Sequence, residues 1–110
     1  MKYIQSQEID IDNSIFIFED IYESMREAIQ ALMSLKGYKP YSHEATVAFL
    51  AEFYSKQFSE NSIRTFDRYR EMRNDIVYSS RQISKTETEK ALQFAIPFID
   101  EIRTILEIAQ

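Results

Sequence analysis

The sequence predicts an all-α protein folded as a four-helix, up-and-down antiparallel bundle. Glycine occurs once and proline twice in the 110 residues, which leaves little turn chemistry for a β sandwich or barrel. Apolar residues recur instead at steps of three and four over four segments, the period of an amphipathic helix. Polar links join these segments, and short links favour antiparallel neighbours. We expect one domain, with an N-terminal arm over residues 1–13 and the bundle over residues 14–110.

The first helix is expected to begin after Asp12 or Asn13, either of which can cap its N-terminus. Its apolar residues run from Phe18 to Met33. It should stop at Gly37, the only glycine, because glycine readily adopts the left-handed conformation that ends many helices. A short hairpin over the arm stays open as an alternative, since isoleucines alternate with acids there.

The second and last helices have start signals of their own. Ser42 is a suitable N-cap for the second helix, whose buried side is marked by Ala45, Phe49, Leu50 and Phe53. Residues 84–87 form a capping box, in which Ser84 and Glu87 cap each other's backbone N–H groups. The last helix then presents an apolar stripe of Leu92, Ala95, Ile96, Ile99, Ile102, Leu106 and Ala109.

The third helix, over residues 62–78, carries a conflict between its pattern and one of its residues. Its apolar face consists of Ile63, Phe66, Tyr69, Met72, Ile76 and Val77. Arg73 falls near the middle of that face, where a guanidinium is costly unless it is paired or lies at a wet seam. Two explanations stay open: a buried ion pair with an acid of the first helix, or a polar-lined seam between the two subunits of a homodimer.

The end of this helix decides which side chains can share a pocket. Arg73 and Tyr78 are five residues apart and diverge by about 140° on a regular helix. Ser79 and Ser80 compete with the backbone for helix hydrogen bonds, so we expect the helix to end within about two residues of Tyr78. The Tyr78 hydroxyl and the Arg73 guanidinium should then line one polar pocket, within a chain or across the dimer.

The distribution of charge points to an anionic ligand. The net charge of −5 argues against a protein that coats nucleic acid non-specifically. Between Arg64 and Lys85, however, six basic residues stand against three acids, a local charge of +3 that leaves −8 elsewhere. Such a basic patch on an acidic body suits an anion held at one place. Alternating charges on a solvated helix face are the other interpretation.

Side chains of this segment suit RNA or a nucleotide. Arginine offers a planar fork for phosphate, asparagine an amide for a base edge, and tyrosine a stacking face. We therefore predict an RNA- or nucleotide-binding site built from Tyr69, Arg70, Arg73, Asn74 and Arg81.

The sequence lacks the residues that disulfides, thiol chemistry, metal sites and membrane spans require. With no cysteine there is no disulfide framework, thiolate metal site or thiol nucleophile. His43, the only histidine, has no partner at metal-ligand spacing, so we expect no metal and no cofactor. The longest apolar run, residues 94–99, is far too short to span a bilayer, and residues 1–12 lack a signal-peptide core. We expect a cytoplasmic protein without membrane contact.

Two stretches resemble the HEPN domain family of bacteria and archaea, which is associated with toxin–antitoxin systems. They are RNDIVY at residues 73–78 and GYKPYSHE at residues 37–44, and the resemblance extends over residues 15–108. It implies an all-helical bundle that is usually dimeric and is often encoded beside a minimal nucleotidyltransferase, which would be its partner protein.

Many members of that family are metal-independent ribonucleases whose site is an arginine, a polar residue, three further positions and a histidine. Arg73 and Asn74 match the first two, but Tyr78 stands where the family has histidine. An unperturbed tyrosine, with a pKa of about 10, is poorly suited to moving protons near neutral pH. The resemblance therefore implies a degenerate site of Arg73, Asn74 and Tyr78 that binds RNA, a nucleotide or a nucleotidyltransferase partner. The alternative is an active ribonuclease toxin in which Tyr78, or His43 from the partner subunit, replaces the missing histidine.

Overall fold

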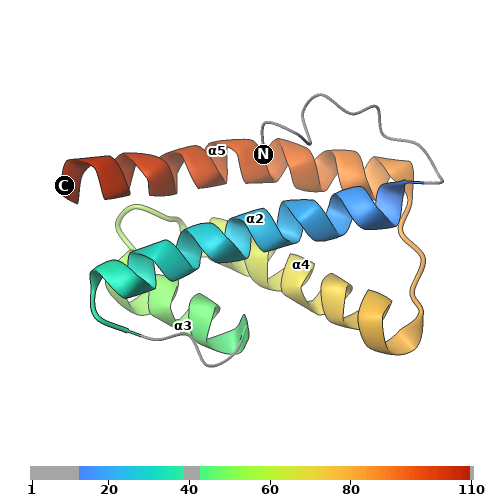
Figure 1. The fold of residues 1–110 in the computed structure, drawn as a ribbon, viewed down its shortest axis with the longest axis horizontal. Coiled ribbons are helices and arrows are strands. Elements are labelled where there is room, and N and C mark those ends of the chain that lie inside the picture. The colour runs from blue at the N-terminus through green and yellow to red at the C-terminus, as the bar shows by residue number, and fades with distance from the viewer. Residues whose placement is uncertain (1–12, 39–42, 110) are drawn as a thin grey trace.

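The computed structural model describes residues 13–38 and 43–109, and these residues form four helices (Figure 1). α2 spans Ser14–Leu35, α3 spans His43–Phe53, α4 spans Glu60–Ser79 and α5 spans Lys85–Ala109. No strand occurs in the described ranges, so the predicted all-α four-helix bundle is confirmed. Within the same ranges, no helix is long and apolar enough to cross a membrane. Residues 1–12 of the expected arm and the expected Ser42 cap lie outside the described residues.

α2 ends through Gly37, as the sequence predicts. Gly37 adopts a φ of 81°, and its N–H donates to the Ser34 carbonyl at 3.0 Å. The Tyr38 N–H donates to the Met33 carbonyl at 2.8 Å. This pair of bonds is the Schellman arrangement, which satisfies carbonyls that the end of a helix leaves without partners. Asn13, one of the two predicted residues, occupies the N-cap position, but its side chain makes no capping hydrogen bond.

α4 and α5 begin with side-chain caps. The Ser59 hydroxyl accepts a hydrogen bond from the Ser62 N–H at 3.1 Å, and α4 therefore starts at Glu60, two residues before the predicted start. Ser84 and Glu87 form the predicted capping box. The Glu87 N–H donates to Ser84 Oγ at 3.0 Å, and the Ser84 N–H donates to Glu87 Oε1 at 3.1 Å.

α4 stops at Ser79, one residue beyond Tyr78, so the predicted helix end is confirmed. Ser80 adopts the left-handed conformation with a φ of 54°. The Arg81 N–H then donates to the Asp75 carbonyl at 3.2 Å, which closes the last turn.

The helices do not all alternate in direction. In the predicted up-and-down order α4 would run parallel to α2, and α5 antiparallel to it. Instead, α4 runs antiparallel to both α2 and α5, and α2 and α5 run in the same direction (Figure 1). At the starts of these two helices, the Thr88 hydroxyl lies 3.5 Å from the Ser14 carbonyl of α2, while it donates to the Ser84 carbonyl at 3.0 Å. Two turns further along, Tyr22 of α2 stacks on Phe66 of α4, which stacks in turn on Phe98 of α5. The first and last of the described helices are therefore parallel neighbours.

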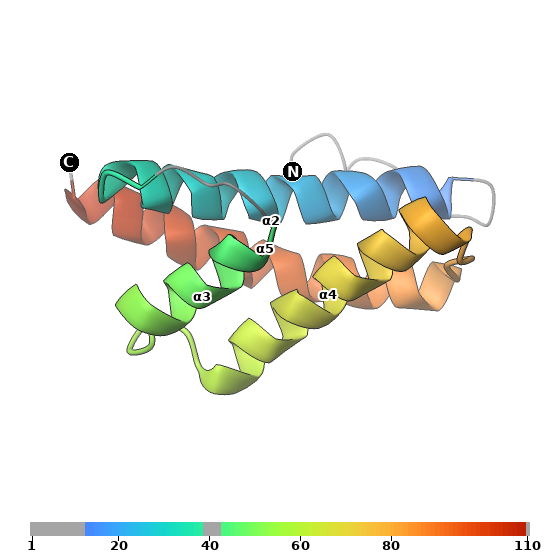
Figure 2. The same cartoon turned by 90° about the horizontal axis from the view of Figure 1, so that it is seen from below.

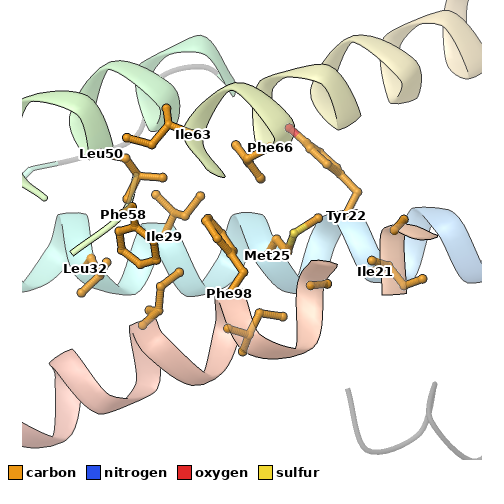
Figure 3. Close-up of a cluster of buried hydrophobic side chains, with 14 of the residues drawn as sticks. Ile21, Tyr22, Met25, Ile29, Leu32, Leu50, Phe58, Ile63, Phe66 and Phe98 are labelled. Carbon is orange, nitrogen blue, oxygen red and sulfur yellow. The ribbon is translucent and has the colours of Figure 1, made fainter. Parts of the chain in front are cut away.

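The core between α2, α4 and α5 is organised around this aromatic stack. The ring centroids of Tyr22 and Phe66 are 5.6 Å apart and those of Phe66 and Phe98 are 5.7 Å apart, with interplanar angles of 13° and 8°. Figure 3 shows the three side chains converging from their separate helices. Such ring pairs contribute about 0.5–1.5 kcal/mol each beyond the burial of their area. The stack fixes how α4 sits against α2, and hence where the site residues of α4 lie.

Candidate functional site

The predicted site residues of α4 lie along its contact with α2. Tyr69 is half-buried, and its ring centroid is 6.0 Å from that of Phe18 on α2 and 5.8 Å from that of Phe94 on α5. Tyr69, predicted as a stacking residue for a base, is thus engaged with rings of the core. One helical turn later, Arg73 is also half-buried. Because residues four apart share a helix face, the packing of Tyr69 sets the direction in which Arg73 leaves the helix.

The pKa of a buried tyrosine of α2 depends on the charged groups at this contact. Tyr22 has no exposed surface, and the pKa of its hydroxyl is raised to about 12, with burial as the largest cause. The adjacent Glu23 carboxylate contributes to this increase, while the guanidinium groups of Arg26, Arg73 and Arg70 oppose it. Figure 3 shows the Tyr22 hydroxyl directed toward α4. Since charge effects weaken with distance, the two helices bring three arginines to the neighbourhood of one hydroxyl.

These arginines differ in their partners. Arg26 forms an ion pair with Glu23 on the same helix. Arg70 Nε donates to Asp67 Oδ1 at 2.7 Å, and only 14% of the Arg70 side chain is exposed. By contrast, no carboxylate within residues 13–38 and 43–109 forms an ion pair with Arg73. The predicted ion pair between Arg73 and an acid of the first helix is therefore absent among the described acids of α2, so it does not account for an arginine on this face.

Asn74 and Tyr78 both lie in the last two turns of α4. The Asn74 side chain is half-buried and makes no hydrogen bond within the described part of the chain. Tyr78 is 80% exposed, and it makes no hydrogen bond to Arg73 within one chain. The polar pocket predicted for Arg73 and Tyr78 would need a second copy of the chain, and it stays a prediction.

Arg81, predicted to bind RNA or a nucleotide, is engaged with the start of α5. Its Nη2 donates to Glu87 Oε2 at 2.7 Å. This bond, followed by the one from the Ser84 N–H, lowers the pKa of the Glu87 carboxyl. Arg81 Nη1 is buried and has no hydrogen-bond partner among the described residues. Arg81 thus ties the end of α4 to the capping box of α5. His43 begins α3, and its side chain lies outside the described residues.

The arrangement has the chemistry of an anion site. A guanidinium without a carboxylate partner can donate two parallel hydrogen bonds to a phosphate. Asn74, the next residue, adds two amide N–H donors. No group of three or more histidine, aspartate or glutamate side chains in the described ranges could hold a metal ion.

Tyr22 and Arg26 are the residues of this contact that the sequence analysis missed. They are four residues apart on α2 and so share one helix face, which was the available signal. What the sequence lacked was the pairing of that face with α4. Comparisons with known proteins add no relative, because no family model, no curated protein and no solved structure matches the chain.

Proposed function

We propose that this chain is a HEPN-like domain protein whose degenerate site binds the phosphate groups of RNA or of a nucleotide. The observation that carries the proposal is that Arg73 is partly buried without a described ion-pair partner. It is half-buried on the face of α4 that packs against α2, and it has no ion pair with any described carboxylate. Arg26, Arg70 and Arg81 all have such a partner.

A guanidinium in this position favours an anion for a physical reason. Half-burial removes part of its hydration, and a carboxylate of the protein would be the usual compensation. A phosphate can supply the same compensation through a bidentate pair of hydrogen bonds. The nearby charges of Arg26 and Arg70 are partly balanced by their own acids, so Arg73 is the cation of this contact with the most to gain from a ligand.

The arrangement supports binding over RNA cleavage. Cleavage needs a group that moves a proton and lies within hydrogen-bond reach of the reacting atoms. Tyr78, at the position of the family's histidine, is 80% exposed and makes no hydrogen bond to Arg73 within one chain. A ribonuclease using Tyr78 or His43 would need a partner subunit to complete its site.

The C-terminal end of α4 exposes side chains that a partner subunit would cover. Val77 belongs to the apolar face of this helix and is nevertheless 45% exposed. The adjacent Tyr78 is exposed, and Arg73 lies one turn earlier on the same face as Val77. We expect a homodimer in which two α4 helices meet around a two-fold axis, with a nucleotidyltransferase as the other partner. Light scattering at tens of micromolar should give about twice the 13.1 kDa mass of the chain, and a monomer there would contradict the homodimer.

Fluorescence anisotropy with a labelled single-stranded RNA and with a labelled ATP analogue tests the binding proposal. Arg73→Ala should weaken binding by about tenfold or more, because charge-assisted hydrogen bonds contribute about 1.5–3 kcal/mol. Arg68→Ala is the matched control. Arg68 is exposed on the same helix and pairs with no carboxylate in the described regions, so its loss should change affinity by less than about threefold. No saturable binding of either probe by the unmodified chain would refute the proposal.

Incubation of the same RNA with the unmodified chain separates binding from cleavage. We expect the RNA to remain intact. Cleavage that is lost in both Arg73→Ala and Tyr78→Phe would establish the ribonuclease instead.

A further inference from the structure

A cavity of about 560 Å³ opens at the C-terminal end of α2, and Arg73 is not among the residues that line it. Its walls come from the last turn of α2, the turn that follows, and one side of α3: Met33, Gly37, Tyr38, Ala45, Ala48, Phe49, Glu52 and Phe53. Figure 2 shows α3 beside the C-terminal half of α2. A hollow of this volume is large enough for a small molecule.

Three aromatic rings make up much of the wall. The centroid of Tyr38 is 5.9 Å from that of Phe49 and 5.3 Å from that of Phe53, and the Phe49 and Phe53 centroids are 5.1 Å apart. The rings are inclined to one another by 43° to 62°, so they do not cover one another's faces by stacking. The face of an aromatic ring carries negative potential, which attracts cations. Tyr38 is 49% exposed, so a ligand can reach it from solvent.

Glu52 adds a formal negative charge to this wall. Its side chain is exposed, and neither an ion pair nor a hydrogen bond engages its carboxylate among the described residues. Ring faces beside a carboxylate recognise a cation with an apolar surface, the chemistry by which aromatic cages hold quaternary ammonium groups. We propose that the cavity binds a small quaternary ammonium compound, with its methyl groups against Tyr38 and Phe49 and its charge near Glu52.

Lys36 shows that this cluster already attracts an ammonium group. Its Nζ lies 5.5 Å from the centroid of Phe53 and 5.6 Å from that of Tyr54, and Lys36 is not one of the cavity-lining residues. As a like charge close to the cavity, Lys36 should weaken the binding of a second cation, whereas Glu52 should strengthen it. These opposite signs distinguish recognition of charge from the filling of an apolar hollow.

Choline is the probe, and 3,3-dimethylbutan-1-ol is its neutral counterpart of the same shape. In aromatic ¹³C NMR titrations of the full chain, choline should produce saturable shifts at Tyr38 and Phe49. The alcohol should bind at least about fivefold more weakly, because it lacks the cation–π contribution. Glu52→Gln should weaken choline binding about threefold, and Lys36→Gln should strengthen it by a similar factor, with the alcohol unaffected by both.

Asp20→Asn is the matched control, since it removes an exposed acid near the other end of α2 and should leave choline binding unchanged. Equal affinity for choline and the alcohol would overturn the proposal, as would the absence of any saturable shift with choline. A preference for choline that both charge substitutions leave unaltered would overturn it too. The cavity is separate from Arg73, so none of these outcomes depends on RNA or nucleotide binding.

Discussion

Replacing Arg73 by methionine tests whether this arginine is present for the fold or for a ligand. Methionine keeps a long, flexible side chain and removes the charge. Because no described carboxylate pairs with Arg73, the substitution leaves no acid without its partner and relieves a partly desolvated cation. Replacing fully buried ions by apolar side chains can stabilise proteins by about 1–4 kcal/mol. Arg73 is only half-buried, so we expect a gain of about 0.5–1 kcal/mol in the free energy of unfolding.

Arg70→Met, one turn earlier on α4, is the matched control. Arg70 donates to Asp67 at 2.7 Å and is 14% exposed, so its loss leaves a half-buried carboxylate without that partner. We expect a loss of about 1–2 kcal/mol. This lies below the full value of a hydrogen bond to a charged group, because Asp67 keeps part of its contact with solvent.

Thermal unfolding followed by far-UV circular dichroism compares the two variants. At roughly 4 °C per kcal/mol for a domain of this size, Arg73→Met should raise Tm by about 2–4 °C and Arg70→Met should lower it by about 4–8 °C. A loss of about 2 kcal/mol or more in Arg73→Met would refute the reasoning, because such a loss indicates a broken structural interaction. The same variant should lose RNA and nucleotide binding, so stability and binding should change in opposite directions.

Three further predictions concern the fold. Phe66→Ala empties a fully buried position between two stacked rings and should lower the free energy of unfolding, measured by urea titration, by about 3–5 kcal/mol. Phe16→Ala removes a ring that is 73% exposed and should lower it by less than about 0.5 kcal/mol. Gly37→Ala should cost about 1 kcal/mol in the same titration. The added methyl meets no atom within 4 Å, but alanine must adopt a φ of 81°, and an unchanged stability would contradict this account. The Arg81 hydrogen bond lowers the pKa of Glu87 on folding, so its contribution to stability is present above the usual value of 4.5 and is lost as pH falls through the lowered pKa. Glu87→Gln should therefore reduce the fall of Tm on acidification below about pH 4.5, and an identical pH profile would show that this ion pair contributes nothing.

The elements that the sequence predicts well are those encoded by a few neighbouring residues. Gly37 ends α2, Ser84 and Glu87 start α5, and the serines after Tyr78 end α4. Each signal acts through hydrogen bonds to the backbone within a few positions, so it needs no knowledge of the rest of the fold. The period of the apolar residues likewise predicts which faces are buried.

The features that the sequence does not predict depend on how distant segments meet. The parallel direction of α2 and α5 follows from the path of the chain, which helix periodicity does not specify. The same limit applies to the arginines. The sequence pattern does not distinguish Arg70, Arg73 and Arg81. In the structure, Arg70 pairs with Asp67 of its own helix and Arg81 pairs with Glu87 of α5. Arg73 has no described ion-pair partner. The sequence does not reveal the cavity beside Glu52, because its walls come from two helices and the turn after the first.

Because α2 packs in parallel against α5, its most extensive partner is the last of the described helices to be synthesised. The contact between Thr88 and Ser14 joins residues 74 positions apart, and such long-range closure slows folding relative to bundles built from helical hairpins. Until α5 emerges from the ribosome, Phe18 and Tyr22 of α2 can already contact Tyr69 and Phe66 of α4, but the side of α2 that packs against α5 lacks the surface that buries it. During that interval the apolar face of α2 is a target for chaperones and for aggregation, and the interval ends only when the final helix closes the bundle.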